Sequence, residues 1–324
     1  MPSLNTLLGG ISKERFLDEF WQKKPLSVKN ALPDLSPLIE PDELAGFATN
    51  EEIYSRLIVG EELKVEYGPF DAERFLKLPE RHWSLLVNGM DLWSSKIKPL
   101  ISYLDFLPRW RFDDIMVSYS SDGGNVGAHY DHYDVFLIQG LGKKSWKLGG
   151  LCDEDTLLSA HNELRIIDDF NPERELVMST GDLLYLPPQY AHFGTSIGKS
   201  ITYSIGFRMP SCSEILGDLS VELISKARFP KYVKDPELNS LANIDHISNE
   251  YVSEIRTVLL EILSDDSLLL EWFAKYMTEP KYPEVIDITN EERVAIISSH
   301  EAQKEISAIS QNFKKFKNGR LVQG

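Results

Sequence analysis

The chain has few cysteines, no long apolar run and a shortage of basic residues, and each shortage excludes a class of protein. Among its 324 residues, only Cys152 and Cys212 are cysteines, too few for a disulfide scaffold or a zinc site with several cysteine ligands. The longest apolar runs, such as 135–138 and 268–270, are far shorter than a membrane span. The N-terminus lacks a basic segment followed by an apolar one. We therefore expect no signal peptide, no membrane span and a cytoplasmic protein.

The shortage of basic residues leaves a strongly acidic chain. The 34 Lys and Arg residues face 50 Asp and Glu residues, which gives a formal net charge of −16. Such a surface repels phosphate backbones, so direct nucleic-acid binding is not expected, whereas basic proteins would be attracted. The short basic stretch Phe313–Arg320 is accordingly interpreted as solvated surface.

The order of sequence patterns predicts an α+β chain. The first hundred residues are interpreted as helices, because Ser12 is a good N-cap before apolar residues at 16, 17, 20 and 21, and because 41–44 and 71–75 have helix-start composition. From 114 to 209 the chain is rich in β-branched and aromatic residues broken by glycine turns, which predicts short antiparallel strands in a sandwich or barrel. After Pro210 the helical period returns.

Two helices are expected in this last part. One follows the apolar stripe formed by Tyr251, Ile255, Val258, Leu259 and Ile262, and the other covers 268–276. A weaker helical pattern starts at Asn290.

The sequence around His129 carries the chemistry. In a strand, residues two apart share a face, so His129 and Asp131 would present an imidazole and a carboxylate together. His192, which follows a Pro-Pro corner, is the best third ligand, and two His with one carboxylate is the ligand set of non-haem Fe(II) oxygenases. A second H-x-D, His132-Tyr133-Asp134, would lie on the opposite face, and spacing alone does not choose between the two.

Several motifs together resemble one family. The stretch 114–136, with G-x-H-x-D-x-x-D-V-F, and the segments 139–146, 181–188, 203–208 and 20–26 resemble the bacterial branch of the Jumonji-C, or cupin-4, 2-oxoglutarate oxygenases, of the ribosomal-protein arginyl hydroxylase type. The resemblance runs over roughly residues 10–280. It implies a double-stranded β-helix (jelly-roll) with Fe(II) held by His129, Asp131 and His192, and it places Asp134 near the site without making it a ligand.

The resemblance also implies 2-oxoglutarate and O₂ as co-substrates. It places Lys144 where the nearest relatives carry an arginine that meets the distal carboxylate of 2-oxoglutarate; a lysine supplies a point charge in place of a bidentate fork. Lys143 is the neighbour that could replace it. Ser120 or Tyr119 could add a hydroxyl to the same carboxylate. Thr202 and Ser204 are alternatives on a later strand.

The family implies a substrate and an assembly as well. Its members hydroxylate an arginine of the sixteenth large-subunit ribosomal protein, and an acidic enzyme suits a basic target. Four residues near the expected mouth are available to an arginine side chain: Asp122, Tyr130, Tyr133 and Asp134. Histidine hydroxylation in another ribosomal protein, demethylation or small-molecule oxidation, and a non-catalytic cupin binding module are the alternatives.

The expected organisation has three parts. Residues 1–210 form the catalytic domain with its helical start, 211–280 a helical region through which a homodimer forms, and 281–324 a partial or reduced winged-helix-like tail. Other residues have plain interpretations: Trp146 packs in the core, the two cysteines are small buried residues, and His82, His161, His246 and His300 are surface or capping residues.

Overall fold

The chain divides into two compact units. The computed structural model describes residues 4–160, 163–226, 232–236, 247–289, 291–298 and 313–323. One unit is Met1–Met209 and the other Pro210–Gly324. Within the described ranges, no helix is long and apolar enough to cross a membrane.

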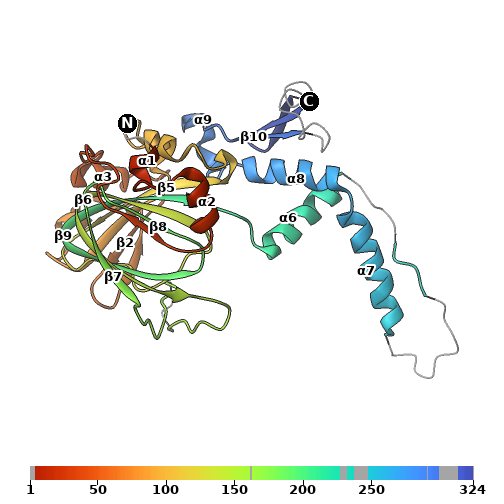
Figure 1. Ribbon diagram of the computed structural model, residues 1–324, viewed down its shortest axis with the longest axis horizontal. Helices are drawn as coiled ribbons and strands as arrows, with labels where there is room; N and C mark the ends of the chain where they lie inside the picture. Colours follow the sequence, from red (N-terminus) through yellow and green to blue (C-terminus); the bar gives the residue numbers. More distant parts are fainter. Residues whose placement is uncertain are drawn as a thin grey trace. The chain divides into compact units, whose positions relative to one another are not determined.

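The first unit is built from short helices and one curved antiparallel sheet (Figure 1). The strands lie in the order β1-β8-β6-β9-β5-β4-β2-β3, and β7 pairs with β6. In chain order, the elements are α1 Leu4–Leu7, α2 Lys13–Glu19, β1 Leu26–Val28, α3 Pro41–Phe47, β2 Ser55–Val59, β3 Lys64–Tyr67, α4 Ala72–Leu76, β4 Trp83–Val87, α5 Met90–Trp93, the 3₁₀ helices η1 Lys98–Leu104 and η2 Arg109–Arg111, β5 Phe112–Ser120, β6 Asp134–Leu151, β7 Arg174–Ser179, β8 Leu183–Leu186 and β9 Tyr190–Phe207.

The predicted N-terminal helices form, but they are not the whole of the first hundred residues. The Ser12 hydroxyl accepts a hydrogen bond from the Arg15 amide at the start of α2, and Pro41 stands in the first turn of α3. The interpretation of this region as helical was wrong for β1 to β4. These strands have three to five residues each; β2 and β3 form a local hairpin, whereas β1 pairs with β8 and β4 with β5, which lie farther along the chain. Local periodicity does not reveal such pairings.

Two long strands shape the sheet. β6 and β9 have 18 residues each and pair with each other along most of their length. Their register shifts between Gln139 and Lys143, where Gly142 has a φ of +69°. Beyond this bend, the second half of β6 pairs with β7 and with the first half of β9. Each long strand therefore contributes to both halves of the curved sheet.

The two halves of the sheet enclose an apolar interior. Val135, Leu137, Leu184 and Leu186 from one half pack with the inward-facing residues of the other half, which are Trp146, Leu148 and Met178. This agrees with the expected jelly-roll, although its long strands are not the short ones predicted.

The opposite face of the first half is covered by the N-terminal segment. Phe16 of α2 contacts the rings of Phe136 and Tyr185, and the alternate residues Ile115, Val117 and Tyr119 of β5 belong to the same core. Alternation along β5 therefore directs Ser118 and Ser120 to the enclosed side of the sheet.

The described part of the second unit contains three longer helices and a small sheet. Its elements are α6 Cys212–Ser225, α7 Asn249–Leu263, α8 Asp266–Thr278, the 3₁₀ helix η3 Pro283–Val285, α9 Ile286–Thr289, β10 Val294–Ser298, β11 Phe313–Lys317 and β12 Arg320–Gln323. The helices predicted around 251–262 and 268–276 are confirmed. The helix predicted from Asn290 was wrong, since Val294–Ser298 is a β-branched strand that pairs with β11.

The cysteines differ in environment. Cys152 is buried, as expected, whereas Cys212 is exposed. The expectation was wrong for Cys212 because it is the first residue of α6, directly after the N-cap Ser211.

Candidate metal centre

Three side chains of the first unit converge at one mouth of the sheet. Ligand atoms of His129, Asp131 and His192 all lie within 4.8 Å of one another. The backbones of His129 and His192 exchange a pair of hydrogen bonds of 3.0 and 2.8 Å, and the Gln189 amide donates to the Asp131 carbonyl at 2.7 Å. Residues 63 positions apart in the sequence are thereby fixed side by side. Two imidazoles and one carboxylate in this arrangement suit an Fe(II)-type divalent cation.

Both imidazoles are turned so that Nε2 faces the centre. The Nδ1 of His129 lies 3.0 Å from the Gly127 carbonyl, and the Nδ1 of His192 lies 2.9 Å from the Tyr190 carbonyl. A carbonyl can only accept, so each Nδ1 carries the proton and each Nε2 keeps a lone pair. Such outer hydrogen bonds orient metal-binding histidines.

Burial keeps His192 in the form that a metal requires. The side chain of His192 is only 4% exposed, with Nε2 3.7 Å from Asp131 Oδ2. Burial, helped by the nearby His129, lowers the pKa of His192 to about 4. The imidazole is therefore neutral near pH 7, and neutral imidazole is the ligand species.

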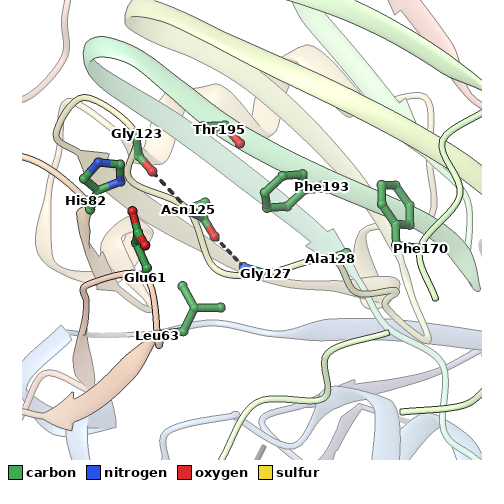
Figure 2. A pocket seen from close by; sticks show the side chains of 10 residues that line it. All are labelled: Glu61, Leu63, His82, Gly123, Asn125, Gly127, Ala128, Phe170, Phe193 and Thr195. Carbon is green, nitrogen blue, oxygen red and sulfur yellow. Dashed lines mark hydrogen bonds between the residues drawn. The ribbon is translucent and has the colours of Figure 1, made fainter. Parts of the chain in front are cut away.

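The segment before His129 is held by glycines and an asparagine. Figure 2 shows the Asn125 amide donating to the Gly123 carbonyl at 3.1 Å, while its Oδ1 accepts from the Gly127 amide at 3.0 Å. Gly123 and Gly127 have φ values of +74° and +83°, which other residues adopt only with strain. A Cβ on Gly124 would lie 2.2 Å from the Trp83 carbonyl oxygen. The G-G-N-x-G stretch therefore fits this turn closely and positions His129.

The second H-x-D motif, His132-Tyr133-Asp134, does not join the group of metal-binding candidates. Asp134 is fully buried on the helix-covered face, where it forms an ion pair with Arg111 at 3.0 Å and accepts hydrogen bonds from Tyr185 and Gln22. Its expected availability to a substrate arginine was therefore wrong. His132 is exposed and lies 3.5 Å from Arg165.

Lys144 is a buried cation beside the three metal-binding candidates. It is 5% exposed, and its Nζ lies 5.1 Å from the centre of the Trp146 ring, which in turn lies 6.0 Å from the His192 ring. Burial lowers the pKa of Lys144 to about 8. No acidic side chain among the described residues forms an ion pair with this ammonium group. A buried cation without an anion suits the carboxylate of a bound ligand. Lys143, its possible replacement, is exposed.

The residues expected to offer a hydroxyl to the carboxylate of 2-oxoglutarate lie on different faces of the sheet. Ser120 is buried on the enclosed side, and its Oγ lies 2.8 Å from Ser84 Oγ. Tyr119 points to the helix-covered core, so it does not reach the interior. Thr202 is buried with Oγ1 3.4 Å from Gln139 Oε1, and Ser204 is half-buried on the same side as Thr202.

The residues expected at the mouth have different surroundings. Tyr133 is partly exposed, and its pKa is raised first by Asp131 and then by burial, Asp114 and Asp113. The carboxylates of Asp131 and of the buried Asp113 and Asp114 on β5 therefore lie near Tyr133, and Asp113 also faces Arg208 at 3.7 Å. Asp122 instead pairs with Arg81 and accepts from the Gly198 amide at 2.7 Å. The Tyr130 ring contacts His132 and lies 6.0 Å from the Arg165 guanidinium.

Two residues of the site were not identified from the sequence. Trp146 is buried as predicted, but its ring also lies beside both Lys144 and His192. The sequence offered a signal for this, because residues two apart in a strand, such as Lys144 and Trp146, share a face. Ser84 had no such signal in the sequence, because its strand, β4, was interpreted as helical. His82 lines a surface pocket, and His161, His246 and His300 lie outside the described residues.

Comparison with known proteins places this geometry in a family. Residues 99–215 match the JmjC domain. The chain is 39% identical over 233 residues to a probable ribosomal oxygenase of Haemophilus influenzae, a match that covers 71% of this chain and 55% of that protein. It is 32% identical over 269 residues to the ribosomal protein uL16 3-hydroxylase of Escherichia coli, covering 82% of this chain and 71% of that protein.

Solved structures agree with the sequence relatives. The X-ray structure of Escherichia coli YcfD has a TM-score of 0.81 at 27% identity and covers 97% of this chain and 86% of that one. YcfD, a ribosomal oxygenase, has also been solved in complex with cobalt and 2-oxoglutarate, with a TM-score of 0.78 at 26% identity. The matches span about half the length of the Haemophilus relative, 55%, and 71% of the Escherichia coli hydroxylase. The fold, the convergent His-Asp-His group and these matches together show that the chain belongs to the ribosomal oxygenase family of JmjC-domain proteins.

Proposed function

We propose that this protein is an Fe(II)- and 2-oxoglutarate-dependent hydroxylase of a ribosomal protein, with β-hydroxylation of an arginine in uL16 as its reaction. The observation that carries the proposal is the convergence of His129, Asp131 and His192 within 4.8 Å beside the buried Lys144, which has no ion-pair partner among the described residues. The uL16 3-hydroxylase relative supports the substrate, and the cobalt and 2-oxoglutarate complex of YcfD supports the cofactor and co-substrate. A ribosomal substrate would place the enzyme in the cytoplasm.

The residues present fit the cofactor. His129 and His192 offer Nε2 lone pairs and Asp131 offers a carboxylate oxygen, so these three would hold Fe(II) and leave coordination positions for other ligands. Bound iron supplies the oxidative chemistry that couples decarboxylation of 2-oxoglutarate to hydroxylation of a C–H bond. Lys144 binds the distal carboxylate of 2-oxoglutarate, and Ser120 adds a hydroxyl.

The enclosed apolar surfaces exclude water from this chemistry. Leu137, Leu184 and Trp146 line the interior between the sheet halves, so the ammonium group of Lys144 meets its anion in a poorly solvated site. The acidic chain, with a formal net charge of −16, favours a cationic target side chain. This charge favours arginine over histidine, whose imidazole is largely neutral near pH 7.

The experiment is incubation of the purified chain with Fe(II), 2-oxoglutarate, O₂ and uL16, followed by peptide mass spectrometry. We expect one arginine to gain the mass of one oxygen atom, with fragment ions that place it on the side chain, and no gain with His129→Ala. A gain on histidine would replace the arginine assignment. The same gain with His129→Ala, or none with wild type, would disprove the proposal.

A further inference from the structure

A pocket of about 560 Å³ (Figure 2) is lined in part by sequence neighbours of the metal-binding candidates. Phe193 and Thr195 alternate with His192 along β9, so they face the other side of the sheet from the imidazole. Ala128, which directly precedes His129, also lines this pocket. The pocket and the metal centre are therefore separated by one layer of backbone, and a group bound in the pocket cannot reach the centre.

The walls of the pocket are apolar and aromatic. The Phe170 and Phe193 rings lie edge to face with centres 6.3 Å apart, and Leu63 lines the side that Figure 2 shows below them. The aromatic edge-to-face pair exposes ring surface to whatever enters. Such surface binds the aliphatic stem of a long side chain and attracts a cation at its end.

The charged group of the pocket is Glu61. Its side chain is exposed, and within the described part of the chain its carboxylate has no hydrogen bond and no ion pair. His82, which lines the same end, packs its ring on Gly123, where a Cβ would lie 2.6 Å from His82 Cε1. Arg81, one residue before His82, is paired with Asp122. Among the described residues that line the pocket, none is a lysine or arginine.

This lining selects one class of ligand. An anion would be repelled by the Glu61 carboxylate, and a purely apolar group would displace water from that exposed carboxylate without replacing its hydration. A lysine or arginine side chain satisfies both parts, because its stem contacts Phe170 and Phe193 while its charge meets Glu61.

We propose that this pocket is an accessory docking site for a lysine or arginine side chain of the basic protein substrate, different from the residue that is hydroxylated. The identity of the partner rests on the proposed function, and the cation preference rests on the pocket alone. Since the docked residue lies on the far side of β9 from His192, it contributes affinity and alignment of the substrate and takes no part in the reaction.

The direct test uses the full chain without iron or 2-oxoglutarate. A fluorescein-labelled peptide of alternating arginine and glycine is titrated at low salt, and its anisotropy gives the Kd. Glu61→Lys should raise the Kd about fivefold, near the upper limit for one exposed ion pair. Glu62→Lys is the matched control, since Glu62 is exposed on the same turn but does not line the pocket, and it should change the Kd less than about twofold.

Phe170→Leu separates the aromatic contribution from simple burial. It keeps an apolar side chain and should raise the Kd about two- to threefold. Equal effects of Glu61→Lys and Glu62→Lys would mean general attraction to an acidic surface and would overturn the proposal. Absence of peptide binding by wild type would overturn it as well.

A kinetic experiment separates this proposal from the function on which the partner depends. With full-length uL16, Glu61→Lys should raise KM more than it lowers kcat, and Glu62→Lys should leave both unchanged. If wild type does not modify uL16 at all, the proposed function fails, and the peptide titration alone decides whether the pocket binds cations.

Discussion

At the scale of single residues, the least usual group is Lys144. An ammonium group that is 5% exposed is costly unless an anion joins it, and burial already lowers its pKa to about 8. A lowered pKa means that the charged form is present below about pH 8 and is lost above it. Any ligand carboxylate that depends on this charge must bind less tightly as the pH rises.

We therefore expect the KM for 2-oxoglutarate to rise about tenfold between about pH 7 and about pH 9. With a pKa of about 8, the protonated fraction of Lys144 falls about tenfold over this range. Lys144→Arg keeps its charge throughout this range and should show a flat profile. Succinate formation at varied 2-oxoglutarate measures both. Parallel profiles for the two proteins would show that another group titrates.

Asp134 illustrates a buried charge with a structural use. It is fully buried against Arg111, which is itself 6% exposed. Asp134→Asn should lower the free energy of unfolding by about 3–5 kcal/mol, because Arg111 would keep its buried charge without a partner. Urea unfolding measures the loss. Asp122→Asn, which breaks the exposed pair with Arg81, is the control and should change stability little.

These residues also show how far the sequence could be interpreted. His129, Asp131 and His192 were identified because H-x-D spacing and a family resemblance agreed, and Lys144 because it fell within a matched motif. Whether a side chain is buried and paired depends on segments distant in sequence. Arg111, Tyr185 and Gln22 surround Asp134 from three separate segments of the chain, so nothing near Asp134 in the sequence could show that it is inaccessible.

At the scale of elements, the bend of β6 allows one strand to serve both halves of the sheet. Gly142 sits at this bend with a φ of +69°, and a Cβ there would lie 2.0 Å from the Lys199 carbonyl oxygen. Gly198 has the same φ of +69° but open space around the position of a Cβ. Comparing alanine substitutions at the two glycines therefore distinguishes the cost of backbone strain from the cost of steric contact.

Gly198→Ala should cost about 1–2 kcal/mol of unfolding free energy, the usual penalty of a left-handed conformation for an L-residue. Gly142→Ala should cost about 3 kcal/mol or more, because β6 or β9 must also shift. Denaturant unfolding of both variants measures the difference. Equal losses would show that the close contact with Lys199 is relieved without cost.

Element prediction from the sequence succeeded where the pattern was local. The stripe from Tyr251 to Ile262 is sufficient to indicate α7, and β-branched runs indicated the strands from β5 to β9. It failed for β1, β4 and β10, which pair with strands distant in the sequence, and for the β2–β3 hairpin, whose short turn at 60–63 was not recognised. The length of β6 and β9 was missed because the glycines at their bends were interpreted as turns.

At the scale of the whole molecule, α7 has an apolar side without a partner in the described part of its unit. None of its described residues is buried, and Val252, Ile255, Leu259 and Leu263 are 43–53% exposed. These four recur at helical spacing and form one stripe. Such a stripe is typical of an interface between subunits.

We expect the protein to be a homodimer in solution and Leu259→Asp to convert it to a monomer. Thr257→Asp, which adds the same charge on the opposite side of the helix, should leave the dimer intact. Light scattering after size-exclusion chromatography gives the mass of each. A dimer that persists with Leu259→Asp, or a monomeric wild type, would show that this stripe has another use.

The paired backbones of His129 and His192 have a consequence for how the protein acquires its metal. Their mutual hydrogen bonds hold the two imidazoles in position through the sheet itself, and the carbonyls of Gly127 and Tyr190 fix the orientation of the rings. Assembly of the fold therefore does not wait for the ion, unlike the small domains in which metal and folding are one event. Iron would bind a site that the fold already holds in place, so the supply of metal would set how many molecules are active, and bound metal would add to the stability of the folded form.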